Sequence, residues 1–97
     1  MNIGICKIRL RLPENGSLKE KRQVLKSLTT RVKNRYNVAI AEVDDQDLWQ
    51  LATLGIACVS NSAQYADEML AKTVEFIIHS RLDLEMLDYD IEIISFP

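Results

Sequence analysis

The sequence has little of the residues that build disulfide scaffolds, metal clusters and disordered linkers. It contains two cysteines, one histidine, three glycines and two prolines. Cys6 and Cys58 lie far apart in apolar, strand-like runs, and no CxxC motif is present. A zinc cluster therefore lacks ligands, and we expect both thiols to be buried and free. Nothing in this composition is typical of a disordered chain.

Long apolar runs are missing as well. No stretch approaches the roughly 18 residues that a membrane-spanning helix needs. The first twelve residues, MNIGICKIRLRL, alternate apolar and basic side chains, whereas a signal peptide has a continuous apolar stretch. We expect a cytoplasmic protein that makes no membrane contact. A length of 97 residues predicts a single domain, residues 1–97.

The charges that are present are divided unevenly along the chain. Residues 1–40 hold ten Lys and Arg against two Glu, a formal charge of +8. Residues 41–97 hold two basic residues against twelve acids, a formal charge of −10. Such an asymmetry indicates either a basic face that meets an anionic partner or mutual neutralisation between the halves, or between two copies of the chain.

The first half reads as a strand followed by a helix. Residues 3–12 alternate apolar and polar side chains, as in a half-buried strand. Ser17, followed three residues later by Glu20, is typical of a capping box and predicts a helix that extends to about Tyr36. The positions expected on its apolar face are Leu18, Leu25, Leu28, Val32 and Tyr36.

The second half reads as two strands, a helix and a last strand. Residues 37–43 and 51–60 are strand-like, and the second of these is nearly all apolar, as in the middle of a sheet. Asn61 or Ser62 caps a helix that extends to about Ser80. Its inward positions are expected to be Ala63, Ala66, Leu70, Val74 and Ile77. Residues 86–94 alternate again, with Leu87, Tyr89, Ile91 and Ile93 expected inward.

The resulting order is βαββαβ. Right-handed crossovers place both helices on one face of a four-stranded antiparallel sheet, so the predicted fold is a ferredoxin-like α+β sandwich. In this arrangement the first and third strands are central, and the fourth lies antiparallel beside the first. Outward-facing cations on the first strand then lie next to outward-facing acids on the fourth, which predicts cross-strand ion pairs. The two rows are Lys7, Arg9 and Arg11, and Asp88, Asp90 and Glu92.

Three stretches of the chain, RLRLPENGSLKEKR, NVAIAEVDDQDLWQ and LGIACVSN, carry a resemblance to a known family. They resemble the YlxP-like family of small bacterial proteins, which has no established function. The resemblance implies a ferredoxin-like fold. It also implies a gene neighbourhood that often contains translation and ribosome-maturation factors, which points by association to RNA or the ribosome. The family supplies no agreed catalytic residues.

The first helix carries a line of cations beside its apolar face. At 100° per residue its members fall within an arc of about 60°. We call this line the basic stripe: Lys19, Arg22, Lys26 and Lys33. It predicts contacts with RNA phosphates, or else a solvated face paired with acids of the second half. Lys21 projects into the apolar face, where it either passes the start of the helix or points at the acidic stretch that follows the second strand.

That acidic stretch, EVDDQDLWQ, covers residues 42–50. Calcium binding by an EF-hand loop is excluded, because Trp49 and Gln50 occupy positions where a ligand and a glycine are needed. A magnesium-dependent enzyme is another alternative, and its metal site would use Asp44, Asp45 and Asp47. The stretch is better explained as a connection between two strands. We therefore predict a non-enzymatic protein with no catalytic residue, no bound metal and no cofactor, and we identify no small-molecule substrate.

A second function class is a protein–protein contact. Trp49 is the only tryptophan of the chain, and tryptophan is enriched at the energetic centres of interfaces. Ile3 and Ile5 are expected on the face of the sheet that no helix covers. These three residues predict self-association of the chain into a homo-oligomer, as the alternative to RNA binding.

Overall fold

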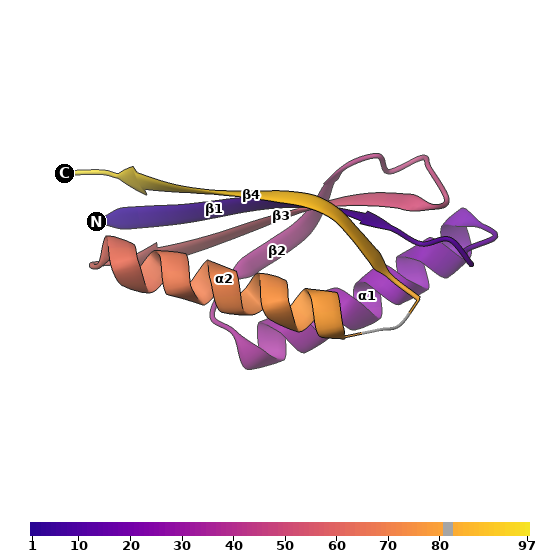
Figure 1. Ribbon diagram of the computed structural model, residues 1–97, viewed down its shortest axis with the longest axis horizontal. Coiled ribbons are helices and arrows are strands. Elements are labelled where there is room, and N and C mark those ends of the chain that lie inside the picture. The colour runs from indigo at the N-terminus through magenta and orange to yellow at the C-terminus, as the bar shows by residue number, and fades with distance from the viewer. Residues whose placement is uncertain (81–82) are drawn as a thin grey trace.

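The computed structural model describes residues 1–80 and 83–97. Its elements are β1 (Asn2–Arg11), α1 (Leu18–Arg35), β2 (Ala39–Asp44), β3 (Leu51–Ser60), α2 (Ala63–His79) and β4 (Glu85–Ser95). All strand pairs are antiparallel, and the sheet order is β2-β3-β1-β4, with β1 and β3 central. Both helices lie on one side of the sheet (Figure 1). The predicted ferredoxin-like α+β fold is confirmed.

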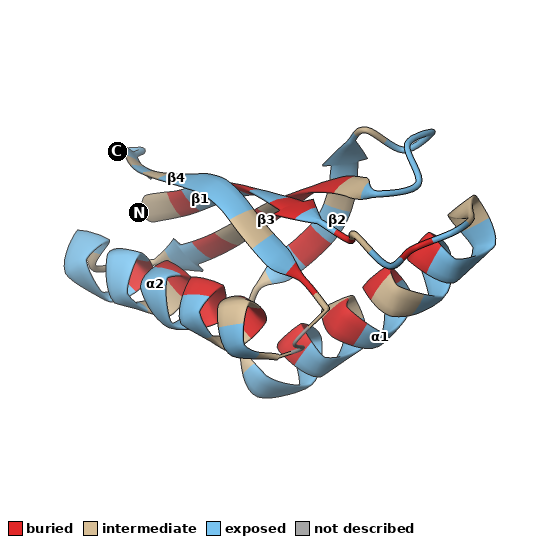
Figure 2. Ribbon diagram, turned by 45° about the vertical axis from the view of Figure 1, so that its right-hand side comes forward, coloured by how far each residue is buried: buried red, intermediate tan, exposed pale blue. Residues whose placement is uncertain are grey.

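The core lies between the sheet and the two helices. Every second residue of β1 faces the helices and is buried, because side chains of a strand alternate between its two faces. Leu25, Leu28 and Val32 of α1 and Leu70 and Ile77 of α2 close the core from below. Figure 2 shows the buried residues gathered where the helices face the sheet, and the exposed residues on the outer sides.

Side chains cap both helices at the predicted positions. The Ser17 hydroxyl accepts a hydrogen bond of 3.1 Å from the Glu20 backbone N–H. The Glu20 carboxylate in return accepts one of 2.9 Å from the Gly16 N–H, one residue before the cap. At α2 the Ser62 hydroxyl accepts a hydrogen bond of 3.2 Å from the Tyr65 N–H. These bonds satisfy backbone donors that a helix start would otherwise leave free.

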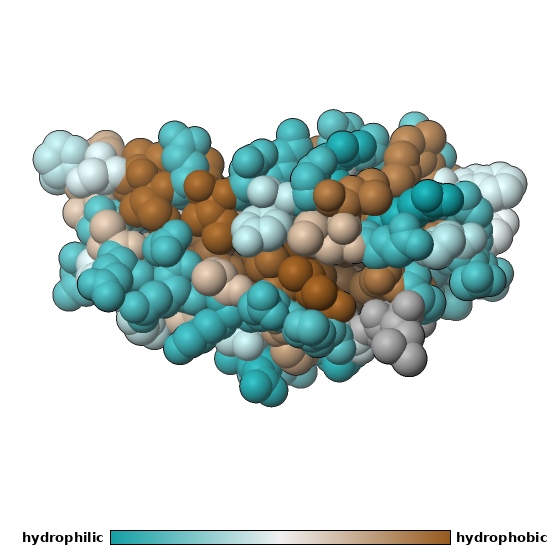
Figure 3. All heavy atoms as spheres, in the orientation of Figure 1, coloured by the Kyte–Doolittle hydropathy of each residue, from teal (hydrophilic) through white to brown (hydrophobic). Residues whose placement is uncertain are grey.

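The inward assignments of Leu87 and Ala63 were wrong. Tyr89 lies on the helix side, in register with the buried Ile8, but it is only partly covered. Leu87 and Tyr89 are 43% and 45% exposed, and Ala63 is exposed in the first turn of α2. The pairing of β4 with β1 shifts between Arg9 and Leu10. Leu87 therefore has no partner on β1 and interrupts the alternation of inward and outward side chains along β4. Because β4 is also an edge strand, α2 covers it only in part. Figure 3 shows apolar atoms at the surface in the band between β4 and α2.

The two charged rows on the open sheet face meet as predicted over part of their length. Lys7 pairs in register with Asp90, and Arg9 with Asp88. Past the shift, Arg11 lies opposite Glu85. At the other end of the row, before the shift, Glu92 lies opposite Ile5. Arg9 and Asp88 form an ion pair of 3.2 Å between exposed side chains. Exposed pairs contribute about 0–1 kcal/mol, so this one adds little stability.

Candidate nucleic-acid interface

The surface of α1 is strongly basic. The helix carries seven of the twelve Lys and Arg residues and a single acid, Glu20. All four members of the basic stripe are exposed. Within the ranges 1–80 and 83–97 the ion pairs are those of Arg9, Lys21 and His79, and none involves the basic stripe. Acids of the second half therefore do not neutralise the stripe in the part of the chain that the structure describes.

The packing of α1 presents the basic stripe to the solvent as one line. Lys21, Leu25, Leu28 and Val32 are buried, and the stripe lies roughly 120° round the helix from them at 100° per residue. From Lys19 to Lys33 the helix rises about 21 Å at 1.5 Å per residue. The other flank of α1 meets α2, where two further arginines contact Phe76.

Lys21 points at the acidic stretch, which is one of the two positions predicted for its side chain. Its side chain is 1% exposed. The ammonium donates hydrogen bonds of 2.8 Å to the Asp45 carbonyl and 3.1 Å to the Leu51 carbonyl. It also lies 2.9 Å from Oε2 of Glu42. A cation taken out of water needs such partners, and here they come from both ends of the connection between β2 and β3.

The carboxylates of the acidic stretch serve this connection in different ways. Glu42 Oε2 is buried and accepts no hydrogen bond from the residues that the structure describes, so its contact with Lys21 is an ion pair outside hydrogen-bond geometry. Asp45 has a φ of 60°, in the left-handed region. Its carboxylate accepts a hydrogen bond of 2.6 Å from the Thr53 hydroxyl, which fixes this backbone conformation.

The same connection is fastened to the loop before α1. Asn15 is buried, and its side-chain amide donates a 2.7 Å hydrogen bond to the Trp49 carbonyl. The Gln50 amide donates to the carbonyls of Pro13 and Asn15, at 3.2 Å each. The Leu12 N–H donates a hydrogen bond of 2.8 Å to the Gln50 carbonyl. The acidic stretch is therefore a structural junction between two loops and the start of α1.

No arrangement at the acidic stretch points to metal chemistry. Across residues 1–80 and 83–97, no group of three or more His, Cys, Asp or Glu side chains is placed to hold a metal ion. A magnesium-dependent activity of Asp44, Asp45 and Asp47 receives no support from this geometry. Asp45 uses its carboxylate for Thr53, and Asp44 accepts a hydrogen bond of 2.8 Å from the Asp45 N–H.

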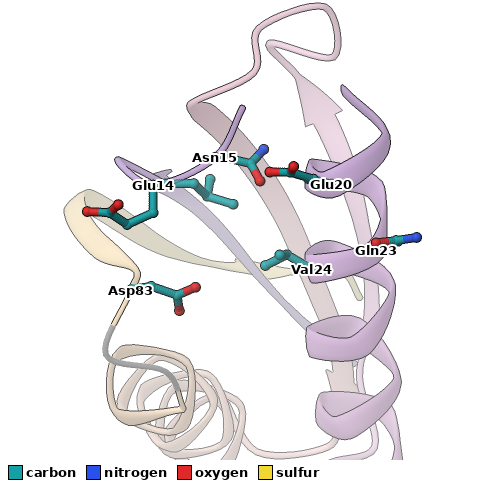
Figure 4. Close-up of a pocket in the computed structure, with 7 residues that line it drawn as sticks. Glu14, Asn15, Glu20, Gln23, Val24 and Asp83 are labelled. Carbon is teal, nitrogen blue, oxygen red and sulfur yellow. The ribbon is translucent and has the colours of Figure 1, made fainter. Parts of the chain in front are cut away.

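An acidic cavity of about 360 Å³ lies on the other side of the same loop. Figure 4 shows Glu14 and Asp83 on one side of it, and Glu20 and Gln23 extending from α1 on the other. The Glu20 carboxylate is already used by the Gly16 N–H. Three carboxylates among the lining residues repel phosphate, so this cavity does not extend the nucleic-acid interface.

The three residues predicted for a protein interface do not form one surface. Ile3 and Ile5 lie on the open sheet face, where Ile3 is in register with Val59 on one side and Ile94 on the other. Trp49 is exposed in the connection before β3. It lies near the end of β1 that pairs with Leu51, roughly 26 Å along the strand from Ile3 at 3.3 Å per residue.

A groove between the helices was missed at the level of sequence. It has a volume of about 530 Å³ and is lined by Arg35, Tyr36, Ala71, Lys72, Glu75, Phe76 and His79. The only signal was the spacing of Arg31 and Arg35, which places two like charges one turn apart. Its other wall comes from α2, and the contact between the helices cannot be derived from either helix alone.

Comparison with known proteins identifies the family. A family model described as "Protein of unknown function (DUF503)" matches residues 3–91. The chain belongs to this family. It is also 44% identical over 75 residues to the "Uncharacterized protein YlxP" of Bacillus subtilis (strain 168), and that alignment covers 77% of this chain and 82% of the relative. The resemblance to YlxP-like proteins is therefore confirmed.

The stretches that resemble this family have a structural role here. RLRLPENGSLKEKR contains Asn15, Ser17 and Lys21, and NVAIAEVDDQDLWQ contains Glu42 and Asp45. These residues make the junction between the two loops and the start of α1.

Neither α1 nor α2, within the described ranges, is long and apolar enough to cross a membrane.

Proposed function

We propose that the protein is a non-enzymatic RNA-binding protein of the cytoplasm that holds the phosphate backbone of RNA, free or in the ribosome, along the basic stripe. The observation that carries this proposal is the line of four exposed cations, which has no acidic partner in the part of the chain that the structure describes. Lysine and arginine at the surface are the residues that neutralise phosphates and release their counterions.

The geometry favours a polymer over a small anion. The basic stripe extends over about 21 Å of helix, longer than a single phosphate can span. It lies on a convex helix face. Its contacts would read no bases, because phosphate contacts fix position and carry no sequence information. β1 and β3 have no aromatic side chain on which a base could stack, as it does on a central strand of an RNA-recognition motif.

The test is a salt titration of RNA binding with two variants of equal charge. In the first, Lys19, Lys26 and Lys33 become Gln. In the second, the control, Lys7, Arg9 and Arg11 become Gln. Both take the formal net charge from −2 to −5. Binding to ribosomal RNA and to a single-stranded RNA of 20 nucleotides is measured by filter retention between 50 and 200 mM salt.

We expect the affinity of the unmodified protein for the single strand to fall about 50-fold over this range, since four phosphate contacts give a slope near −2.8. In the stripe variant the slope of log affinity against log salt concentration should become about 2.1 less steep, and in the control it should stay unchanged. Equal losses in both variants would mean that net charge alone matters. Negligible retention at 50 mM salt by the unmodified protein would also refute the proposal.

Self-association through the open sheet face is the second candidate function. Val59, Ile3 and Ile94 form an apolar row across three strands, and Val59 is 68% exposed. Beside them lies a shallow apolar hollow of about 340 Å³ that Ile5 borders. Its floor is made of small residues: Ala39, Ala41, Gly55 and Ala57. An uncovered apolar area of this kind fits a second copy of the same face.

Sedimentation velocity over a hundredfold range of concentration tests this candidate. The unmodified chain should shift from monomer to dimer as its concentration rises. Val59→Lys should weaken the dimer at least about tenfold, because each copy would bury a charge. Leu48→Lys, on the distant exposed connection, is the matched control and should leave the shift unchanged. A monomer at every concentration excludes self-association.

A further inference from the structure

The groove between α1 and α2 lies on the flank of α1 away from the basic stripe. The C-terminal ends of both helices approach each other below the sheet (Figure 1). Their facing side chains border an open groove of about 530 Å³, a size within the usual range of small-ligand sites. The lining is largely apolar, and cations stand at its rim. This combination fits a ligand that has both an apolar body and a negative charge.

Two arginines of α1 are held over one aromatic ring of α2. The guanidinium carbon of Arg31 lies 5.5 Å from the Phe76 ring centroid, and that of Arg35 lies 5.3 Å from it. Arg35 is also 5.8 Å from the ring of Tyr36, which meets Phe76 edge to face. Such cation–π contacts use the faces of the guanidinium groups, so their N–H edges stay available to a ligand.

Most of those N–H donors have no acceptor in the part of the chain that is described. Arg31 donates one bond of 3.5 Å to the Ser80 carbonyl, and Arg35 donates one of 3.3 Å to the Tyr36 hydroxyl. Each guanidinium has five donors. The acid in the lining is Glu75, which lies 3.1 Å from His79 and pairs with neither arginine.

The charges of the groove therefore call for an anion. Arg31 and Arg35 are one turn apart, an arrangement of like charges that destabilises a helix by a few tenths of a kcal/mol. Lys72 adds a third cation from α2. The guanidinium edge of Arg35 matches a phosphoryl group, which accepts paired N–H donors. The aromatic and apolar wall beside them suits a flat, hydrophobic base.

We propose that this groove is a nucleotide-binding site. The phosphoryl group is held by Arg35 and Lys72 of the lining, and the base lies against Tyr36 and Ala71. Arg31 contacts Phe76 from outside the lining and adds positive charge beside the site. The nucleotide has two sources with the same chemistry: a free mononucleotide, or the 5′-phosphorylated end of an RNA chain. The site is independent of the basic stripe, which holds internal phosphates on the other flank of α1.

Backbone amide NMR titrations with small probes test this site directly. The probes are AMP, adenosine and inorganic phosphate. We expect AMP to shift amide signals in and around Arg35, Ala71 and Phe76, and the other two probes to do so at least roughly tenfold more weakly. Shifts confined to the basic stripe, or no shifts at millimolar AMP, would refute the nucleotide site.

Variants separate binding from folding. Arg31→Gln combined with Arg35→Gln should weaken AMP binding at least about tenfold, and Lys7→Gln combined with Arg9→Gln, the matched control, should not. Should the first variant unfold, Lys72→Gln takes its place, because it removes a rim charge without touching the stacked pair. We expect it to weaken AMP binding several-fold at an unchanged melting temperature. Unchanged AMP affinity in a folded variant refutes the site.

The two sources are distinguished with four-nucleotide RNAs that carry a 5′-phosphate or a 5′-hydroxyl. Tighter binding of the phosphorylated RNA than of AMP assigns the groove to RNA ends, and the reverse assigns it to free nucleotides. The Arg31 and Arg35 variant should keep its salt-dependent retention of long RNA. Failure of the groove and failure of the basic stripe are therefore seen in separate assays.

Discussion

Lys21 and Arg9 are both cations paired with a carboxylate, yet their surroundings give these pairs different weights. Arg9 and Asp88 are exposed on the open sheet face, where water screens the attraction. Lys21 is buried, and its partners are Glu42 and the backbone carbonyls of Asp45 and Leu51. Removal of a buried charge partner leaves unpaired groups out of water, which is strongly destabilising.

We predict that Lys21→Met lowers the free energy of unfolding by about 3 kcal/mol or more, because Met fills the space but leaves the buried Glu42 carboxylate without its cation and two carbonyls without the ammonium donor. Urea denaturation at pH 7 measures this loss. Adding Glu42→Leu should recover part of it, since the orphaned carboxylate is then gone. Arg9→Gln is the exposed control and should cost less than about 1 kcal/mol. A Lys21→Met protein as stable as the Arg9→Gln protein would contradict this assignment.

Cys6 links stability to alkaline pH. Burial, and in second place the charge of Asp90, raise the pKa of the Cys6 thiol from 9.0 to about 11. The folded state therefore keeps its proton where the unfolded state has lost it. This contribution is fully present below the unfolded pKa, near 9, and is lost as the pH rises towards 11. Burial also raises the pKa of Cys58, against a hydrogen bond from the Gly4 backbone that lowers it.

We predict that the unmodified protein loses more stability than Cys6→Val between pH 8 and 11. A shift of this size corresponds to a difference of up to roughly 2.7 kcal/mol. Urea denaturation of both proteins across the range measures it. Other groups that titrate there are common to the two proteins and cancel in the comparison. Parallel stability curves would show that Cys6 does not carry the effect.

At the scale of the elements, the approach of α2 to β1 depends on Gly4. A Cβ at this position would lie 2.8 Å from Leu70 Cδ1 and 3.1 Å from Cys58 Sγ. Glycine therefore lets the helix and the strand come into contact here. The only other close approach among the described glycines is at Gly55, where Val43 leans over the open sheet face.

Gly4→Ala should destabilise the protein by about 1–3 kcal/mol, because α2 must move away from the sheet to admit the methyl group. Gly16→Ala is the matched control: its Cβ would meet only Glu20 oxygens at 3.7 Å and beyond. That change should be neutral within about 0.5 kcal/mol. Thermal unfolding of both variants gives the comparison, and equal melting temperatures would contradict the role of Gly4.

The elements themselves were predictable from sequence because their signals are local. Ser17 and Ser62 each accept a hydrogen bond from a backbone N–H three residues on. The sequence alone locates the first cap and narrows the second to Asn61 or Ser62. The exposure of Leu87 could not be predicted from such local signals. The alternation around it is regular, and only the register shift against β1 explains its exposure. A register shift depends on two strands more than 70 residues apart, so one strand cannot reveal it.

At the scale of the whole molecule, the division of charge becomes a division of surfaces. The cations of the first half lie mainly on α1, and the acids of the second half lie mainly on β4, α2, β2 and the β2–β3 connection. The basic stripe was predictable because its members share one helix. The arginine groove was not, because Arg35 and Phe76 meet only after both helices pack on the sheet.

The two carbonyls that bind Lys21 have a consequence for how this sequence can vary among its relatives. Any residue supplies a backbone carbonyl, so the side chains at positions 46–48 are free of this bond. The number of residues between Asp45 and Leu51 is constrained, however, because an insertion would move one of the two carbonyl acceptors away from the Lys21 ammonium. We therefore expect relatives that keep a lysine at position 21 to tolerate substitutions at positions 46–48 but not changes in the length of this connection.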